Sequence, residues 1–134
     1  MDYDADWYIL AGDETALPAI ATIIETLPAS IPAQVYLEVL DNAEEQELPN
    51  LPLVQVFWLH RGHNQAVPGQ MLLSALRNIS IPEGNGHVWI GCEASVVRSA
   101  KKMFIEDRFL DETKIHAQGY WQHGRLNHPD HDVA

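Results

Sequence analysis

Residues 7 to 18 of the chain read Trp7-Tyr8-Ile9-Leu10-Ala11-Gly12-Asp13-Glu14-Thr15-Ala16-Leu17-Pro18. The first five form a short apolar run, which is typical of a strand buried in a parallel sheet. Beyond Gly12 the spacing becomes helical, with apolar residues three or four apart at Leu17, Ile20, Ile23, Ile24 and Leu27. A strand that ends at a glycine and leads directly into a helix predicts the start of a β-α-β unit.

The same alternation continues along the chain. Apolar runs predict four further strands, at residues 35–40, 53–59, 87–90 and 114–119, and helical spacing predicts helices near 72–79 and 94–104. The acidic, proline-containing stretch 41–52 is interpreted as a surface loop, in which residues 43–48 have room for one helical turn. Strands and helices joined by short links require right-handed crossovers. We therefore predict an α/β fold, a doubly wound, mostly parallel five-stranded sheet with helices on both faces.

The length of 134 residues fits a single domain, expected to be structured over about 6–124, with a polar tail at 122–134. The N-terminus carries three acidic residues among its first six, and no apolar run approaches the roughly 18 residues that span a bilayer. A cytoplasmic protein without a membrane-inserted segment is expected.

The charge balance restricts the possible partners. Eight Lys and Arg residues against nineteen Asp and Glu give a formal net charge of −11, which repels nucleic-acid backbones and anionic membranes. An anionic cofactor would have to bind through local features, such as a helix N-terminus or one well-placed arginine. The single cysteine, Cys92, excludes an internal disulfide and a multi-cysteine metal cage.

In a doubly wound sheet, ligands bind beyond the carboxyl ends of the strands. The predicted ends are Gly12-Asp13-Glu14-Thr15, Asp41, His60-Arg61-Gly62, Gly91-Cys92-Glu93 and Gly119-Tyr120-Trp121. The first turn has one glycine and lacks the G-x-G-x-x-G fingerprint of dinucleotide folds. Because proline is tolerated only in the first turn of a helix, Pro18 predicts Thr15 as the N-cap. The free N–H groups of that turn would suit a phosphate, and the alternative is a plain capped helix.

Three other residues allow a functional and a structural interpretation. Arg61 at a strand end suits a phosphate such as the 2′-phosphate of NADP, or is simply solvated. Cys92 opens a helix, which lowers a thiol pKa, but no Ser/His/Asp or Cys/His constellation accompanies it, so it is expected only to line a pocket. Trp121 is either the edge of the core or a stacking platform. We assign no catalytic residue.

The seven histidines raise the question of a metal. His60 and His63 are three positions apart, and His123, His128 and His131 lie in the tail near Asp130 and Asp132. These positions fall in loops and in the polar tail, where no rigid element fixes a ligand geometry. No metal site is predicted.

The sequence resembles the C-terminal domain of the siderophore-interacting proteins, flavin-dependent ferric-siderophore reductases related to the ferredoxin–NADP reductases. The resemblance lies in residues 6–20, in Trp58-Leu59-His60-Arg61-Gly62, in residues 88–98 and in Gly119-Tyr120-Trp121, in the order of the family. It covers residues 6 to about 124. At Gly91-Cys92 the family more often has Ala-Gly.

The resemblance implies a five-stranded sheet that binds NADPH. By analogy, Gly12, Asp13, Glu14, Thr15 and Ala16 would cradle the pyrophosphate, and Arg61 would meet the 2′-phosphate. The analogy further places Gly91, Cys92 and Glu93 at the border of the nicotinamide, and Trp121 toward the flavin.

Members of the family carry an FAD-binding N-terminal barrel, and we expect this chain to lack it. As an enzyme the domain is then expected to be incomplete, passing hydride from NADPH to FAD on a missing or partner domain that reduces the ferric siderophore. The alternative is a non-catalytic nucleotide-binding or regulatory module with the same fold.

Overall fold

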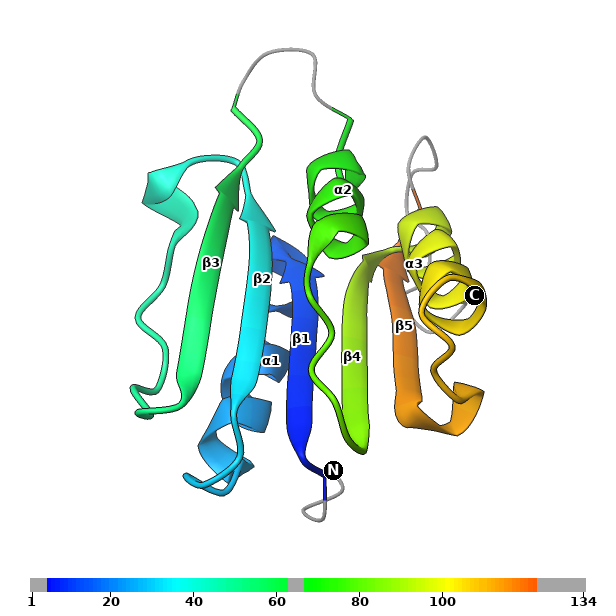
Figure 1. Ribbon diagram of the computed structural model, residues 1–134. Coiled ribbons are helices and arrows are strands. Elements are labelled where there is room, and N and C mark those ends of the chain that lie inside the picture. Colours follow the sequence, from blue (N-terminus) through cyan, green and yellow to red (C-terminus); the bar gives the residue numbers. More distant parts are fainter. Residues whose placement is uncertain (1–4, 63–66, 123–134) are drawn as a thin grey trace.

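The structure is a computed structural model that describes residues 5–62 and 67–122. Its centre is a sheet of five parallel strands in the order β3-β2-β1-β4-β5 (Figure 1). The strands are β1 Trp7–Asp13, β2 Ala33–Val39, β3 Val54–His60, β4 Gly86–Glu93 and β5 Ile115–Trp121. The predicted fold class is therefore confirmed.

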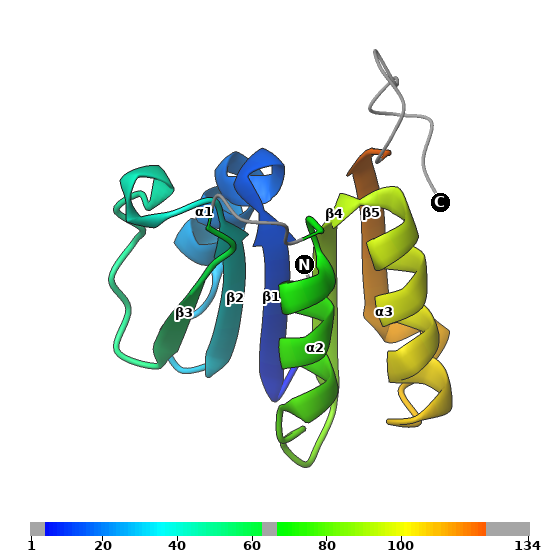
Figure 2. The same cartoon turned by 90° about the horizontal axis from the view of Figure 1, so that it is seen from above.

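Helices cover both faces of the sheet. Helix α1 (Leu17–Thr26) packs on one face, and α2 (Gln70–Asn78) and α3 (Ala94–Glu106) pack on the other (Figures 1 and 2). Each face has its own apolar core. Ile20 and Ile24 of α1 belong to one, and Leu72 of α2 and Phe104 of α3 belong to the other. All four side chains are fully buried, which is the outcome expected of amphipathic helices on a central sheet.

The side on which successive strands join the sheet changes between β1 and β4. The first crossover passes from β1 through α1 to β2, whereas the later ones, through α2 and α3, add β4 and β5 on the other side of β1. The carboxyl ends of β1 and β4 therefore form the topological switch point, where open α/β sheets bind their ligands.

Two strands continue past the glycines that were expected to end them. Gly12 and Gly91 are register partners within the β1–β4 ladder, and the strands run on to Asp13 and Glu93. A Cβ on Gly12 would lie 2.7 Å from the Cβ of Ala16 and 2.8 Å from the backbone oxygen of Gly91. The glycine thus serves a close approach between strand and turn, and does not mark the end of the strand.

The connection from β2 to β3 contains one short 3-10 turn, η2 (Asn42–Glu44). This stretch was interpreted as a surface loop, but its residues Leu48 and Leu51 are partly buried and pack against the core on the α1 face. Trp58 of β3 is only partly buried, because β3 is an edge strand with an incomplete cover. Among the helices of the described residues, none has the length and apolar character needed to cross a bilayer.

Candidate functional site

The turn after β1 differs from the predicted cap. A 3-10 turn, η1 (Glu14–Ala16), comes first, and α1 begins only at Leu17. The carboxylate of Asp13 caps η1 by accepting from the backbone N–H of Thr15 at 3.0 Å. The Thr15 hydroxyl donates to the same oxygen, so Thr15 is not the N-cap. Because Asp13 already occupies the N–H of Thr15, that group is not free for a phosphate.

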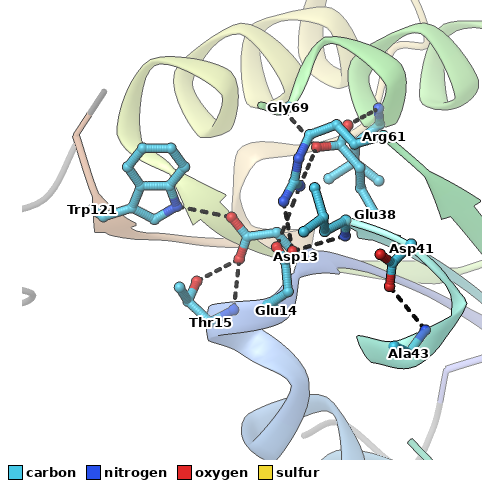
Figure 3. Close-up of polar contacts among 11 residues, drawn as sticks. Asp13, Glu14, Thr15, Glu38, Asp41, Ala43, Arg61, Gly69 and Trp121 are labelled. Atoms are coloured by element: carbon cyan, nitrogen blue, oxygen red, sulfur yellow. Dashed lines mark hydrogen bonds and ion pairs between the residues drawn. The ribbon is translucent and has the colours of Figure 1, made fainter. Parts of the chain in front are cut away.

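Asp13 also connects the turn to the last strand. Its other carboxylate oxygen, Oδ2, accepts from the indole Nε1 of Trp121 at 2.8 Å (Figure 3). Burial raises the pKa of the Asp13 carboxyl above its ordinary value, and this effect outweighs the hydrogen bonds from Thr15 and Trp121, which lower it. Trp121 remains partly exposed, as expected of a residue at the rim of a site.

Arg61 lies just after β3 and is paired with two carboxylates. Its Nη2 lies 2.5 Å from Oε2 of Glu14, and its Nη1 lies 2.9 Å from Oε2 of Glu38 (Figure 3). The Arg61 side chain is 13% exposed, that of Glu14 29%, and that of Glu38 0%. The group carries a formal charge of −1, so Arg61 is not a free cation in this state.

Glu38 is the residue of the site that the sequence analysis missed. Its Oε2 accepts from the backbone N–H of Gly69 at 2.7 Å, and its Oε1 accepts from that of Leu72 at 2.9 Å, so it caps the first turn of α2. The available signal was one acidic residue inside the otherwise apolar strand of residues 35–40, because a buried glutamate is almost always paired.

The last residues of β4 are buried. Glu93 is buried and caps α3, accepting from the backbone N–H of Ser95 at 3.0 Å and of Val96 at 3.1 Å. Cys92 is fully buried in the core on the α2–α3 face, and burial raises the pKa of its thiol. It was expected to line a pocket at the start of a helix, and the core position leaves it without that helix-terminus activation.

The predicted residues thus form two groups. Asp13, Thr15 and Trp121 are hydrogen-bonded at the β1 and β5 side, and Glu14 and Arg61 are paired toward β2 and β3. Gly12, Ala16, Gly91 and Cys92 lie buried beneath them. The site is therefore a polar edge that follows the carboxyl ends of the sheet.

The histidines form no metal site in the part of the chain that the structure describes, since no three His, Cys, Asp or Glu side chains are grouped there around a common point. Nε2 of His60 lies 2.5 Å from a carboxylate oxygen of Glu45. His63 and the tail residues His123, His128 and His131 lie outside the described residues.

Fold and site together define an α/β domain with a polar edge at a topological switch point. Residues 5–124 match the family model described as "Siderophore-interacting protein". The chain belongs to the siderophore-interacting protein family.

Related proteins agree with this assignment. The ferric vibriobactin reductase ViuB of Vibrio cholerae is 31% identical over 130 residues, covering 96% of this chain and 47% of that protein. The ferric acinetobactin reductase of Acinetobacter baumannii is 27% identical over 87% of this chain and 40% of its own length. The chain thus spans about half the length of the curated relatives it matches.

Solved structures share the fold. A siderophore utilization protein from T. fusca is 38% identical with a TM-score of 0.84, covering 98% of this chain and 50% of that one. The siderophore-interacting protein of Acinetobacter baumannii is 27% identical with a TM-score of 0.82, over 92% and 49% of the two chains. The cytochrome P450 reductase GcoB of Amycolatopsis, 20% identical with a TM-score of 0.66, shares the fold.

Proposed function

We propose that this chain is the NADPH-binding domain of a flavin-dependent ferric-siderophore reductase. Bound NADPH would supply a hydride to FAD on another domain, and the reduced flavin would deliver electrons to the chelated Fe(III). Two relatives are named as ferric-siderophore reductases, which supports this reading of the chain. In this proposal the chain contributes binding and orientation of the nucleotide.

The observation that carries the proposal is the arrangement of the polar edge. Arg61 lies after edge strand β3 and Trp121 ends the opposite edge strand, β5, with Asp13 at the end of central β1. Four strand spacings of about 4.8 Å separate the backbones of β3 and β5, or roughly 19 Å, and both side chains reach inward, Arg61 to Glu14 and Trp121 to Asp13. A cation on the β3 side and an aromatic ring on the β5 side suit a ligand with a phosphate and a planar ring.

The residues present fit such a ligand at both ends. The guanidinium of Arg61 can bind a phosphate in a bidentate manner, and the partly exposed indole of Trp121 can stack on a ring. The acidic side chains of the edge are turned toward donors within the protein: Asp13 to Thr15, and Glu93 to the start of α3. Their charges are thereby partly offset before a ligand arrives.

A reconstitution tests the proposal. The chain is mixed with the FAD-bearing half of a family member and a ferric siderophore, and NADPH oxidation is followed by absorbance. We expect oxidation only when all components are present, and calorimetry of the chain alone should show NADPH binding. Absence of nucleotide binding contradicts the proposal, whereas binding without oxidation favours the regulatory alternative.

A further inference from the structure

The arrangement around Arg61 bears on how the proposed site distinguishes NADP from NAD. The obvious reading is that Arg61 alone provides the preference for a 2′-phosphate. In the structure the guanidinium is already engaged by Glu14 through both of its terminal nitrogens, at 3.3 Å from Nη1 and 2.5 Å from Nη2. A phosphate that approaches Arg61 therefore meets a carboxylate first.

The two carboxylates that hold Arg61 differ in what they can do. Glu38 is fully buried and fixed by the backbone N–H groups of Gly69 and Leu72, so it cannot leave. Glu14 is 29% exposed, and its hydrogen-bond partner besides Arg61 among the described residues is the backbone N–H of Leu40, at 2.9 Å. Of the two, only Glu14 has access to solvent, so it is the carboxylate that an entering anion could displace.

The position of the Glu14 carboxylate resembles a bound anion. It is held by a guanidinium and a backbone N–H, the two donor types that proteins use for phosphate oxygens. We propose that Glu14 is an internal competitor of the 2′-phosphate: its carboxylate occupies the anion position at Arg61 and lowers the preference of the site for NADP over NAD. This inference rests on the proposed nucleotide function.

Charge explains the direction of the effect. With Glu14 in place, the Arg61, Glu14 and Glu38 group has a formal charge of −1, and a phosphate dianion would have to enter against it. Glu14→Gln keeps the size and hydrogen-bonding shape of the side chain but brings the group to zero. The neutral amide competes less well for the guanidinium, because it can still accept a hydrogen bond but loses the attraction between two opposite charges.

The test is calorimetric titration of the whole chain with NAD⁺ and NADP⁺, which differ only in the 2′-phosphate. We expect Glu14→Gln to tighten NADP⁺ binding by about tenfold and to leave NAD⁺ binding nearly unchanged. Glu14→Ala should shift the ratio in the same direction, and thermal melts of both variants verify that they are folded. Glu45→Gln is the matched control, since it removes one charge near β3 without touching Arg61.

The possible outcomes separate the two proposals. Suppose that both nucleotides bind, but the ratio of NADP⁺ to NAD⁺ affinity in the folded Glu14 variants is unchanged or reduced. The proposed competition by Glu14 is then wrong, while the proposed nucleotide site stands. An equal rise of the ratio in Glu45→Gln also overturns it, because the effect would then be general electrostatics. If neither nucleotide binds to any of the proteins, the proposed function itself fails, and this inference fails with it.

Discussion

The indole Nε1 of Trp121 donates to Oδ2 of Asp13 at 2.8 Å, so the end of edge strand β5 is tied across β4 to the end of central strand β1. The contact joins residues 108 positions apart in the chain. One hydrogen bond thus joins the β5 side of the polar edge to its centre at β1.

Trp121→Phe removes the donor of this hydrogen bond and keeps a smaller aromatic ring at the position. We expect the free energy of unfolding to fall by about 1 kcal/mol, the usual contribution of one hydrogen bond. The pKa of the Asp13 carboxyl, already raised by burial, should rise further without the donor that lowers it. Urea denaturation and NMR titration of the carboxyl carbon measure the two effects. An unchanged carboxyl titration would show that the contact does not persist in solution.

Asp13 gives the fold a specific pH dependence. A carboxyl whose pKa is raised by folding adds stability that is complete below its unfolded-state pKa, 3.8, and is lost as the pH rises through the folded-state value. Relative to Asp13→Asn, the unmodified protein should therefore gain stability as the pH falls through the raised pKa toward 3.8. Urea titrations of both proteins across this range provide the measurement.

Asp111 supplies the control of opposite sign. Hydrogen bonds from the backbone N–H and hydroxyl of Thr113 lower its pKa below 3.8. The stability that Asp111 contributes is present above pH 3.8 and is lost as the pH falls through the lowered pKa. If Asp13→Asn and Asp111→Asn shift the pH dependence in the same direction, the account of Asp13 is wrong.

Arg61→Ala should destabilise the fold strongly, because it leaves the buried Glu38 carboxylate without its cation. We expect a loss of about 3–5 kcal/mol, the usual cost of breaking a buried pair from one side. The double variant Glu38→Gln/Arg61→Ala should lose less than the sum of the two single losses, since no uncompensated charge remains. Urea denaturation of the four proteins forms the cycle, and additive losses would contradict the coupling. A binding defect of Arg61→Ala alone therefore says little about phosphate recognition.

Cys92 should be inert toward thiol reagents in the native protein. It is fully buried, and burial raises the pKa of its thiol, so the thiolate that reacts is scarce. Labelling with a chromogenic disulfide should be complete in concentrated urea, while the native protein should react only as fast as it unfolds. Rapid native labelling would place Cys92 at an accessible surface.

The sequence was informative where the signal is local. Apolar spacing located α1, α2 and α3 because each helix buries one stripe against the sheet, and the five apolar runs located the strands. The strand ends were less well predicted, because Gly12 and Gly91 look like turn residues but pair with each other in the ladder. That pairing depends on β4 returning beside β1, which no local pattern encodes.

The site shows the same division. Arg61 and Trp121 could be placed at strand ends from the sequence, but their partners could not. Arg61 meets Glu14 and Glu38 from 47 and 23 positions away, and only the sheet order brings these side chains together. The prediction of Thr15 as a cap was wrong because Asp13, two positions earlier, caps the turn η1, and its carboxylate is a stronger acceptor than a hydroxyl.

The contacts of Glu38 also bear on how the protein folds and unfolds. They reach 23 positions to Arg61, 31 to Gly69 and 34 to Leu72, so they can form only after β3 and α2 have docked on β2. Contacts with such long loops to close are expected late on the folding pathway. Weakening them, as in Glu38→Gln, should then accelerate unfolding while the refolding rate changes little. Chevron plots would show this as a shift of the unfolding arm alone, which makes Glu38 a determinant of the lifetime of the native state.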